Sequence, residues 1–549
     1  MRVLFACLLA FVLISAAPPK RPGDALVTVH LAADGIDAEV QLDHQVTRFA
    51  FGDTSVVRDG DFELRTPGLT LKDDAVTAAA PFRAFRLHIR PAPEERDAKY
   101  PAHFRVGAGG VLYAPALKGD ASAWRTRFVF ATRPGEIRTP AAGAAEDGFV
   151  FIGPAALRRR TRGIELIADP AAPAWLAESS AQALAAATAT YAGALGTKLP
   201  HAPVLIVVHR PSPRSFNVGD VTPTGVTSLR FYGESWKRFD PAAARGIQTF
   251  VLHEAFHFWN GGAVHSADGT PTWLHEGGAE YAALLGGLNG KVLTEEDVRL
   301  RLGQALDRCR SGLQQQGDKP LSQIPFLSMQ LRYPCGMVLQ WAADLHLRQA
   351  SGGRRTLLDA WADMLRTARS RPGKDYGLRD FYAAARIADP RAFAPVRLLV
   401  DESGPARWDA LPAALNALGA EIGQVPSPDG RRAALLFHLL RQNCRAGKDL
   451  HIGFYANPGA LKLQSPAECG PLAGDPVLKS IEGGNAFDIG TETYAAVQRK
   501  CEAKEDVTIV TADGRTLAAA CTAPLAPAPL TYVVKRWMPA GGVRVTAGR

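Results

Sequence analysis

The chain has 549 residues, enough for about three to four domains, which excludes a lone peptide-binding module. Hydrophobic residues make up 47% of the chain and charged residues 21%, with a mean hydropathy of −0.05, so a disordered chain and a polytopic membrane protein are also excluded. The net charge of +9 is spread over 63 basic and 54 acidic residues, and nothing indicates a nucleic-acid partner. We expect the densest basic run, residues 158–162, to be a solvated loop.

Residues 1–17 have the features of a secretory signal peptide. Arg2 precedes the apolar residues 3–14, and the small residues 15–17 provide a cleavage site. The apolar stretch is shorter than the roughly 20 residues that span a bilayer, and no later segment is long and apolar enough to do so. We therefore expect an exported protein, periplasmic or secreted, with no membrane span in the mature chain.

The next segment, residues 24–165, predicts an N-terminal β domain. Apolar residues alternate with polar ones over residues 27–31 and again over 38–42, and Asp34 and Gly35 between them predict a turn. This pattern is typical of a β-hairpin. Frequent glycine and proline with short apolar runs continue the pattern, so an all-β domain is expected.

The composition then changes to an α/β pattern and afterwards to a helical one. Residues 166–285 predict a buried strand at 204–208, together with helices at 174–195, 246–259 and 273–285. Residues 286–403 have apolar positions at helical spacing, in four segments: 300–313, 337–347, 357–365 and 381–387. A stretch rich in proline and glycine leads to a last mixed segment, so the predicted fold class is multidomain α+β.

Two histidines in the helix at 246–259 have the spacing of a metal-binding pair. His253 and His257 are four residues apart, so they share one helix face with their Cβ atoms roughly 5 to 6 Å apart. Glu254 between them is near enough to reach a water on the same ion. The alternative is a pair of packing histidines.

A carboxylate in the following helix completes a possible zinc site. Glu276 follows His257 after eighteen residues and can supply a third ligand. Two histidines, one glutamate and a water form a catalytic zinc geometry, because a structural site has four protein ligands. His265 and His275 are rival ligands, but His275 is rotated by ~100° from Glu276, and both are more simply surface or packing residues.

These motifs together resemble the gluzincin zinc metallopeptidases, which include the aminopeptidase N family and the glycyl aminopeptidase family. The sequence segment at residues 257–260 resembles the second family more than the first. Members of the second family are similar in having an N-terminal β domain, a thermolysin-like catalytic domain and a C-terminal PDZ domain. The resemblance implies one zinc ion per chain and a peptide or protein substrate. The implied domains are an N-terminal β domain at 24–165, a thermolysin-like catalytic domain at 166–285, a helical subdomain at 286–403 and a PDZ-like domain at 430–525.

The resemblance also implies roles for two further residues. Tyr333 lies in a segment similar to the Tyr-x-Lys-Gly segment that opens a helix in these families and donates a hydroxyl to the transition state, although Cys335 replaces the lysine. For Tyr333 the alternative is ordinary packing. Glu280 looks like the acid that orients a zinc-binding histidine, and a solvated carboxylate is its alternative.

The C-terminal segment resembles a bacterial PDZ domain. Residues 465–475 are similar to its Ser-Pro-Ala-x-x-x-Gly-Leu-x-x-Gly-Asp run, and a helix at 493–501 and a strand at 507–511 complete the expected order. Such a module adds an extended peptide to a sheet edge. Cys469 and Pro471 depart from the usual pattern.

Six cysteines lie outside the signal peptide, which contains Cys7. An even number in an oxidising compartment predicts up to three disulfides, and six cysteines allow fifteen pairings. The simplest prediction joins neighbours in order: Cys309 with Cys335, Cys444 with Cys469 and Cys501 with Cys521. For the first pair, two buried free thiols are the alternative.

The predicted function is an exported zinc peptidase in which Glu254 is the general base and Tyr333 stabilises the oxyanion. The Gly-x-x-Glu segment that holds the substrate ammonium in related aminopeptidases is missing between residues 209 and 246, so aminopeptidase and endopeptidase modes are both open. Asp220 and Glu234 could replace its glutamate, but surface positions are the simpler expectation for both. The alternative function is a catalytically inert, PDZ-bearing peptide-binding or scaffolding protein of the cell envelope.

Overall fold

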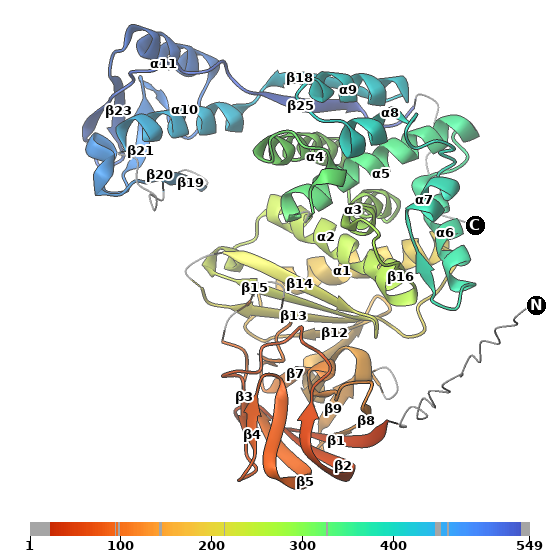
Figure 1. The fold of residues 1–549 in the computed structure, drawn as a ribbon. Helices are drawn as coiled ribbons and strands as arrows, with labels where there is room; N and C mark the ends of the chain where they lie inside the picture. The colour runs from red at the N-terminus through yellow and green to blue at the C-terminus, as the bar shows by residue number, and fades with distance from the viewer. Residues whose placement is uncertain are drawn as a thin grey trace, which may run out of the picture. The chain divides into compact units, whose positions relative to one another are not determined.

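The computed structural model describes residues 22–93, 95–96, 99–141, 145–212, 215–325, 328–444, 452–457 and 460–539. The predicted signal peptide therefore lies outside the described residues. The chain divides into two compact units, the first made of Met1–Ala192 and Thr197–His265 and the second of Gly193–Gly196 and Ser266–Arg549. Parts rich in strands and parts rich in helices follow one another along the chain, so the mixed α+β class that the sequence predicts is observed (Figure 1).

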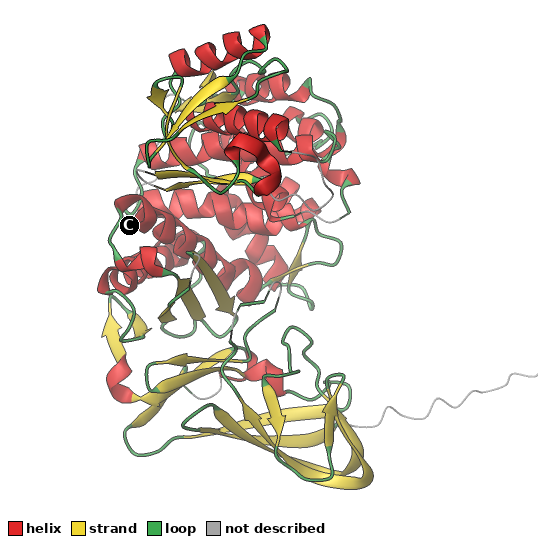
Figure 2. Cartoon of the chain, turned by 90° about the vertical axis from the view of Figure 1, so that its left-hand side faces the viewer, coloured by secondary structure: helices red, strands yellow, loops and turns green. Residues whose placement is uncertain are grey.

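The first unit begins with the predicted hairpin. β1 (Gly23–Leu31) pairs antiparallel with β2 (Ile36–Ala50), with Val27 opposite Val40 and alternate residues buried. Its sheet also contains β3 (Phe62–Leu64), β4 (Thr70–Lys72), β5 (Ala75–Ile89) and β8 (Trp124–Ala131). A second sheet contains β6 (His103–Val106), β7 (Gly109–Tyr113), β10 (Phe149–Pro154) and β9 (Glu136–Thr139). Residues of both sheets contribute to one apolar core, so the predicted all-β character of this part is confirmed (Figure 2).

A five-stranded sheet follows in the same unit. Its order is β11 (Arg158–Thr161), β12 (Ile164–Ala168), β13 (Val204–Arg210), β15 (Val226–Tyr232) and β14 (Phe216–Thr222). β13 lies in the middle, parallel to both neighbours, and is buried along most of its length. β14 is antiparallel to β15 and forms one edge.

The prediction of a solvated loop at residues 158–162 is wrong, because four of these residues form the edge strand β11. Arg160 lies 3.1 Å from Glu165 on the neighbouring strand, and Arg159 pairs with Glu178. A strand at the edge of a sheet borders water on one side, and charged side chains are common there. The long arginine side chains can therefore keep their guanidinium groups in water.

Two helices of the first unit match the predicted segments: α1 (Ala174–Ala194) and α2 (Pro241–His257). Asp240 accepts hydrogen bonds from the backbone N–H groups of Ala242 and Ala243, and Pro241 occupies the first helical position. Both features favour a helix start here, five residues before the predicted one. After His257 the chain continues as a π-helical turn, Phe258–Ala263.

The second unit is helical up to residue 417. Its helices are α3 (Thr272–Asn289), α4 (Glu295–Gln315), α5 (Met329–Ser351), α6 (Leu357–Arg369), α7 (Leu378–Ala384), α8 (Ala394–Val396) and α9 (Arg407–Ala417), with the short strands β16 (His265–Ser266) and β17 (Asp375–Tyr376). Helices α3 and α5 touch through glycines, since a Cβ on Gly277 would lie 2.2 Å from the carbonyl carbon of Gly336. This close approach fixes α5, which carries Tyr333, against α3, which carries Glu276.

The C-terminal part of the second unit has a separate apolar core. Helix α10 (Pro428–Asn443) and α11 (Thr491–Ala503) accompany a sheet of β19 (Gly453–Asn457), β20 (Ala460–Gln464), β21 (Val477–Ile481), β22 (Gly484–Asn485), β23 (Val507–Thr511) and β24 (Thr516–Ala519). The helix and strand predicted at 493–501 and 507–511 are therefore present. β18 (Glu421–Pro426) and β25 (Leu530–Arg536) pair antiparallel and lie beside α9 and α4 (Figure 1).

Three disulfides join the six cysteines outside the predicted signal peptide, and each joins neighbours in order, as predicted. Within the part of the chain that the structure describes, no helix has the length and apolar character to cross a membrane. The three disulfides are compatible with an exported protein.

Candidate active site

Helix α2 brings the two predicted histidine ligands together. The Nε2 atoms of His253 and His257 are 3.1 Å apart, and the ring planes meet at 81°. His253 is buried and His257 is half-buried. The two Nε2 atoms therefore converge on one point, as the four-residue spacing requires.

Asn260 holds the other nitrogen of His257. Its Oδ1 lies 2.8 Å from His257 Nδ1, and because an amide oxygen can only accept, Nδ1 donates and the lone pair is on Nε2. Asn260 is fully buried in the π-helical turn after α2. A carbonyl partner of this kind orients metal-binding histidines in other proteins. No role for Asn260 was predicted from the sequence, although its position three residues after His257 is a usable signal.

The third predicted ligand, Glu276, is half-buried on α3. The described residues contain a group that could hold a metal ion, made of His253, His257 and Glu276, whose ligand atoms all lie within 4.8 Å of one another. The neighbouring His275 is engaged elsewhere, since its Nδ1 lies 2.7 Å from the hydroxyl of Tyr376. Burial, and then the charge of Glu276, raise the pKa of Tyr376. His275 thus has the packing role that the sequence favoured.

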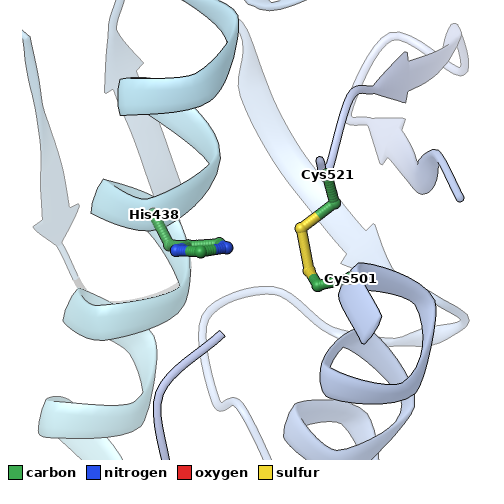
Figure 3. Close-up of side chains that lie close together, drawn as sticks. All are labelled: His438, Cys501 and Cys521. Atoms are coloured by element: carbon green, nitrogen blue, oxygen red, sulfur yellow. A yellow bond between two sulfur atoms is a disulfide. The ribbon is translucent and has the colours of Figure 1, made fainter. Parts of the chain in front are cut away.

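A second group of potential ligands consists of His438, Cys501 and Cys521 (Figure 3). The two cysteines are joined by a disulfide, so neither can supply a thiolate. His438 Nε2 lies 3.0 Å from the carbonyl oxygen of Ala523. This group is therefore part of the C-terminal core in the disulfide-bonded protein.

The two residues singled out by resemblance lie on α5 and α3. Tyr333 is half-buried near the start of α5, with the guanidinium of Arg332 5.0 Å from its ring centroid. Glu280 is half-buried on α3, and its charge opposes the lowering of the pKa of Arg301 by burial. A catalytic role for Tyr333 and an orienting role for Glu280 remain predictions.

The predicted general base, Glu254, is half-buried, and its charge acts on a phenol that the sequence did not indicate. Burial, followed by the charges of Asp220 and Glu254, raises the pKa of Tyr100 to about 12. Tyr100 therefore keeps its proton at neutral pH and can donate it in a hydrogen bond. The side chain stacks on Tyr113, with ring centroids 4.6 Å apart.

Asp220, expected at the surface, lies on the edge strand β14 in an ion-pair cluster. Arg230 on β15 lies 2.6 Å from its carboxylate and also binds Glu95. Burial raises the pKa of Asp220, and Arg230 opposes this effect. The expectation is wrong because the neighbouring strand supplies a compensating cation. Glu234 is exposed and paired with Lys237 at 2.8 Å, as expected.

The fold is similar to that of a solved structure from the aminopeptidase N family. The structure of an aminopeptidase N family protein from Idiomarina loihiensis matches with a TM-score of 0.60, at 13% identity, over 96% of this chain and 100% of that chain. A variant of the M1 zinc metallopeptidase from Deinococcus radiodurans matches with a TM-score of 0.39, at 14% identity, over 70% of this chain and 94% of that chain. At such identities the likeness concerns the fold alone. No protein-family model and no curated protein matches the sequence.

Proposed function

We propose that this chain is a zinc-dependent peptidase. The observation that carries the proposal is the convergence of His253 and His257 at their Nε2 atoms, with Asn260 fixing the tautomer of His257. Two imidazole nitrogens and one carboxylate are a donor set that suits zinc and leaves a fourth position open. His253, His257 and Glu276 would hold the ion. The similarity of the fold to an aminopeptidase N family protein supports the same class.

When bound, zinc would lower the pKa of a coordinated water and polarise a carbonyl oxygen. The carboxylate of Glu254 takes the proton of the attacking water and transfers it to the leaving amine, which completes hydrolysis of the amide bond. The hydroxyl of Tyr333 donates a hydrogen bond to the developing oxyanion. Glu280 would orient one of the histidines. No covalent intermediate with the protein is needed.

We propose more specifically that the chain is an aminopeptidase. The cluster of Asp220, Glu95 and Arg230 contains two carboxylates and one guanidinium, so it carries one net negative charge. The charges of Asp220 and Glu254 both act on the pKa of Tyr100, which supports a position of the cluster near the proposed general base. A negative site there suits a substrate ammonium. Asp220→Asn should then raise the KM of peptides with a free amino terminus and leave N-acetylated peptides unaffected, whereas an endopeptidase would cleave both alike.

We further propose that the protein is exported to the periplasm or secreted and that residues 430–525 form a PDZ-like domain. The three disulfides support export, since such bonds persist in oxidising compartments. The order of strands β19 to β24 with helix α11 supports the PDZ-like assignment. The domain boundaries at 24–165, 166–285 and 286–403 belong to the same proposal.

The test of the proposed function is zinc content together with peptide hydrolysis. The purified chain should hold one zinc ion, and His253→Ala or His257→Ala should remove it. The matched control is His265→Ala, because His265 is exposed and outside the group of potential ligands. A chain without zinc that cleaves no peptide in a mixture would favour the inert scaffolding protein instead.

A further inference from the structure

Five aromatic side chains form a continuous group, here called the aromatic cluster, at one end of the five-stranded sheet of the first unit. Phe216 at the start of β14 lies opposite Tyr232 at the end of β15, and their stacked rings have centroids 4.6 Å apart. The ring centroid of Trp175, near the start of α1, is 6.5 Å from that of Trp236 and 5.5 Å from that of Phe239. A hydrogen bond of 3.2 Å from Trp236 Nε1 to the carbonyl oxygen of Phe216 joins these two groups of rings.

The aromatic cluster is accessible to solvent. Phe239 is 57% exposed and Phe216 is 40% exposed, and the other three side chains are half-buried. Single exposed apolar side chains are ordinary on protein surfaces, whereas a contiguous group of them marks an interaction site. The cluster is therefore a contact surface for a partner that removes apolar carbon from water.

The indole N–H groups of the cluster are already used within it. Trp236 Nε1 donates to the backbone of Phe216, and Trp175 Nε1 donates to the carbonyl oxygen of Trp236 at 3.0 Å. An indole has no other polar atom, so these two side chains present only carbon to a partner. A ligand that is recognised through hydrogen bonds gains little from such a surface, whereas an apolar phase gains contact with all of it.

Positive charge lies between the rings. Lys237 and Arg238, both exposed, occupy the segment between the last two aromatic residues of the cluster. The acidic neighbours are engaged, since Glu234 pairs with Lys237 at 2.8 Å and Asp240 caps helix α2. Arg238 has no ion-pair partner among the described residues, so its charge is available to an anion. The net charge of +9 on the whole chain adds a long-range attraction to an anionic surface.

The aromatic cluster lies away from the histidines of the proposed zinc site. Phe239 precedes α2 at one end of the helix, and His253 lies near the other end. At a rise of about 1.5 Å per residue, the two residues are roughly 20 Å apart along the helix axis. A partner can therefore occupy the cluster independently of the proposed reaction.

We propose that the aromatic cluster attaches the protein reversibly to an anionic phospholipid surface. Aromatic side chains are favoured at the boundary between lipid headgroups and acyl chains, and nearby cations are attracted to anionic headgroups. Phe216 and Phe239 enter this boundary, and Lys237 and Arg238 contact the lipid phosphates. A protein partner fits less well, because protein interfaces carry about one hydrogen bond per 100 to 200 Å² and the indoles of the cluster have no N–H left to donate.

Co-sedimentation with lipid vesicles tests the proposal. The mature protein is used, because the apolar segment of the predicted signal peptide would itself bind lipid. Vesicles of phosphatidylglycerol and phosphatidylcholine in equal parts should bind the protein, and vesicles of phosphatidylcholine alone should bind it at least about fivefold more weakly. Added salt should weaken binding to the anionic vesicles, because it screens the cations. Equal binding to both kinds of vesicle would overturn the proposal, and so would no binding to either, which would point to a protein partner instead.

Two variants and a control locate the contact. Phe239→Ser should weaken binding to the anionic vesicles by about tenfold, because it removes the most exposed ring of the cluster. Val129→Ser is the matched control, since Val129 is 47% exposed on β8 and outside the cluster, and this variant should bind like the original chain. Arg238→Glu, a change at an exposed position, should weaken binding by about fivefold or more. If the Phe239→Ser and Val129→Ser proteins bind equally and thermal unfolding shows both to be folded, the aromatic cluster is not the contact.

Discussion

Replacing Asn260 by alanine removes the acceptor that orients His257. The hydrogen bond from His257 Nδ1 to Asn260 Oδ1 measures 2.8 Å, and Asn260 is fully buried, so water does not readily replace the amide. Losing such a partner typically lowers metal affinity by about 10- to 100-fold, or about 1.4 to 2.7 kcal/mol. This agrees with the cost of about 1 to 3 kcal/mol for a buried group that loses its partner. We therefore expect Asn260→Ala to raise the Kd for zinc by that factor.

The assay is a competition titration of the metal-free protein with zinc and a chromophoric chelator. Asn260→Asp is the matched control, because it keeps an acceptor oxygen in the same position and should bind zinc at least as well as the original chain. Thermal unfolding of the metal-free proteins separates a loss of zinc affinity from a loss of fold. An unchanged Kd in a folded Asn260→Ala protein would show that this amide does not orient a zinc ligand.

Two other substitutions test the reaction and the packing around it. Glu254→Gln should keep zinc and lower peptide turnover by at least about 100-fold, since it removes the general base. Glu234→Gln, at an exposed ion pair, is the control and should leave turnover unchanged. Equal turnover in the two variants would refute the role of Glu254. Gly336→Ala should lower the free energy of unfolding by about 1 to 3 kcal/mol, because the new Cβ would lie 2.5 Å from the carbonyl oxygen of Trp273. Gly246→Ala, where a Cβ meets nothing within 4 Å, should instead stabilise its helix by about 0.5 to 1 kcal/mol in chemical denaturation.

Periodicity predicted the regular elements well, because the pattern of apolar residues reports which face of an element is buried. The hairpin of β1 and β2, the strand β13 and the helices α2 and α3 all lie where the sequence placed them, with boundaries shifted by a few residues. The helix pair that carries His253, His257 and Glu276 could be predicted for the same reason. The proposed metal ligands could be predicted because they depend only on the spacing of residues within one helix and between two consecutive helices.

Contacts between distant parts of the chain were not predictable from the sequence. Arg230 and Glu95 are 135 residues apart, and only the folded chain shows that they make an ion pair with Asp220. The surface position expected for Asp220 failed because a lone aspartate in a sequence does not reveal its cation. The same applies to Arg348 and Trp537, which are far apart in the sequence and line one cavity.

The disulfide between Cys309 and Cys335 allows a last prediction about how the chain holds Tyr333. It links α4 to α5 two residues after Tyr333, and both cysteines are fully buried. The separation of 26 residues gives a stabilisation of about 3.5 kcal/mol in the unfolded-state entropy model. The bond between Cys444 and Cys469 has a separation of 25 residues and hence nearly the same predicted stabilisation, but it lies in the C-terminal core.

The two bonds therefore form a matched pair of experiments. Replacing Cys309 and Cys335 together by alanine should lower both the free energy of unfolding and peptide turnover, because α5 loses its covalent anchor beside Tyr333. Replacing Cys444 and Cys469 together should lower stability by a similar amount and leave turnover close to that of the original chain. Chemical denaturation and initial rates on one peptide substrate give the two readouts. If turnover falls equally in both double variants, or in neither, the disulfide stabilises the chain without positioning the tyrosine.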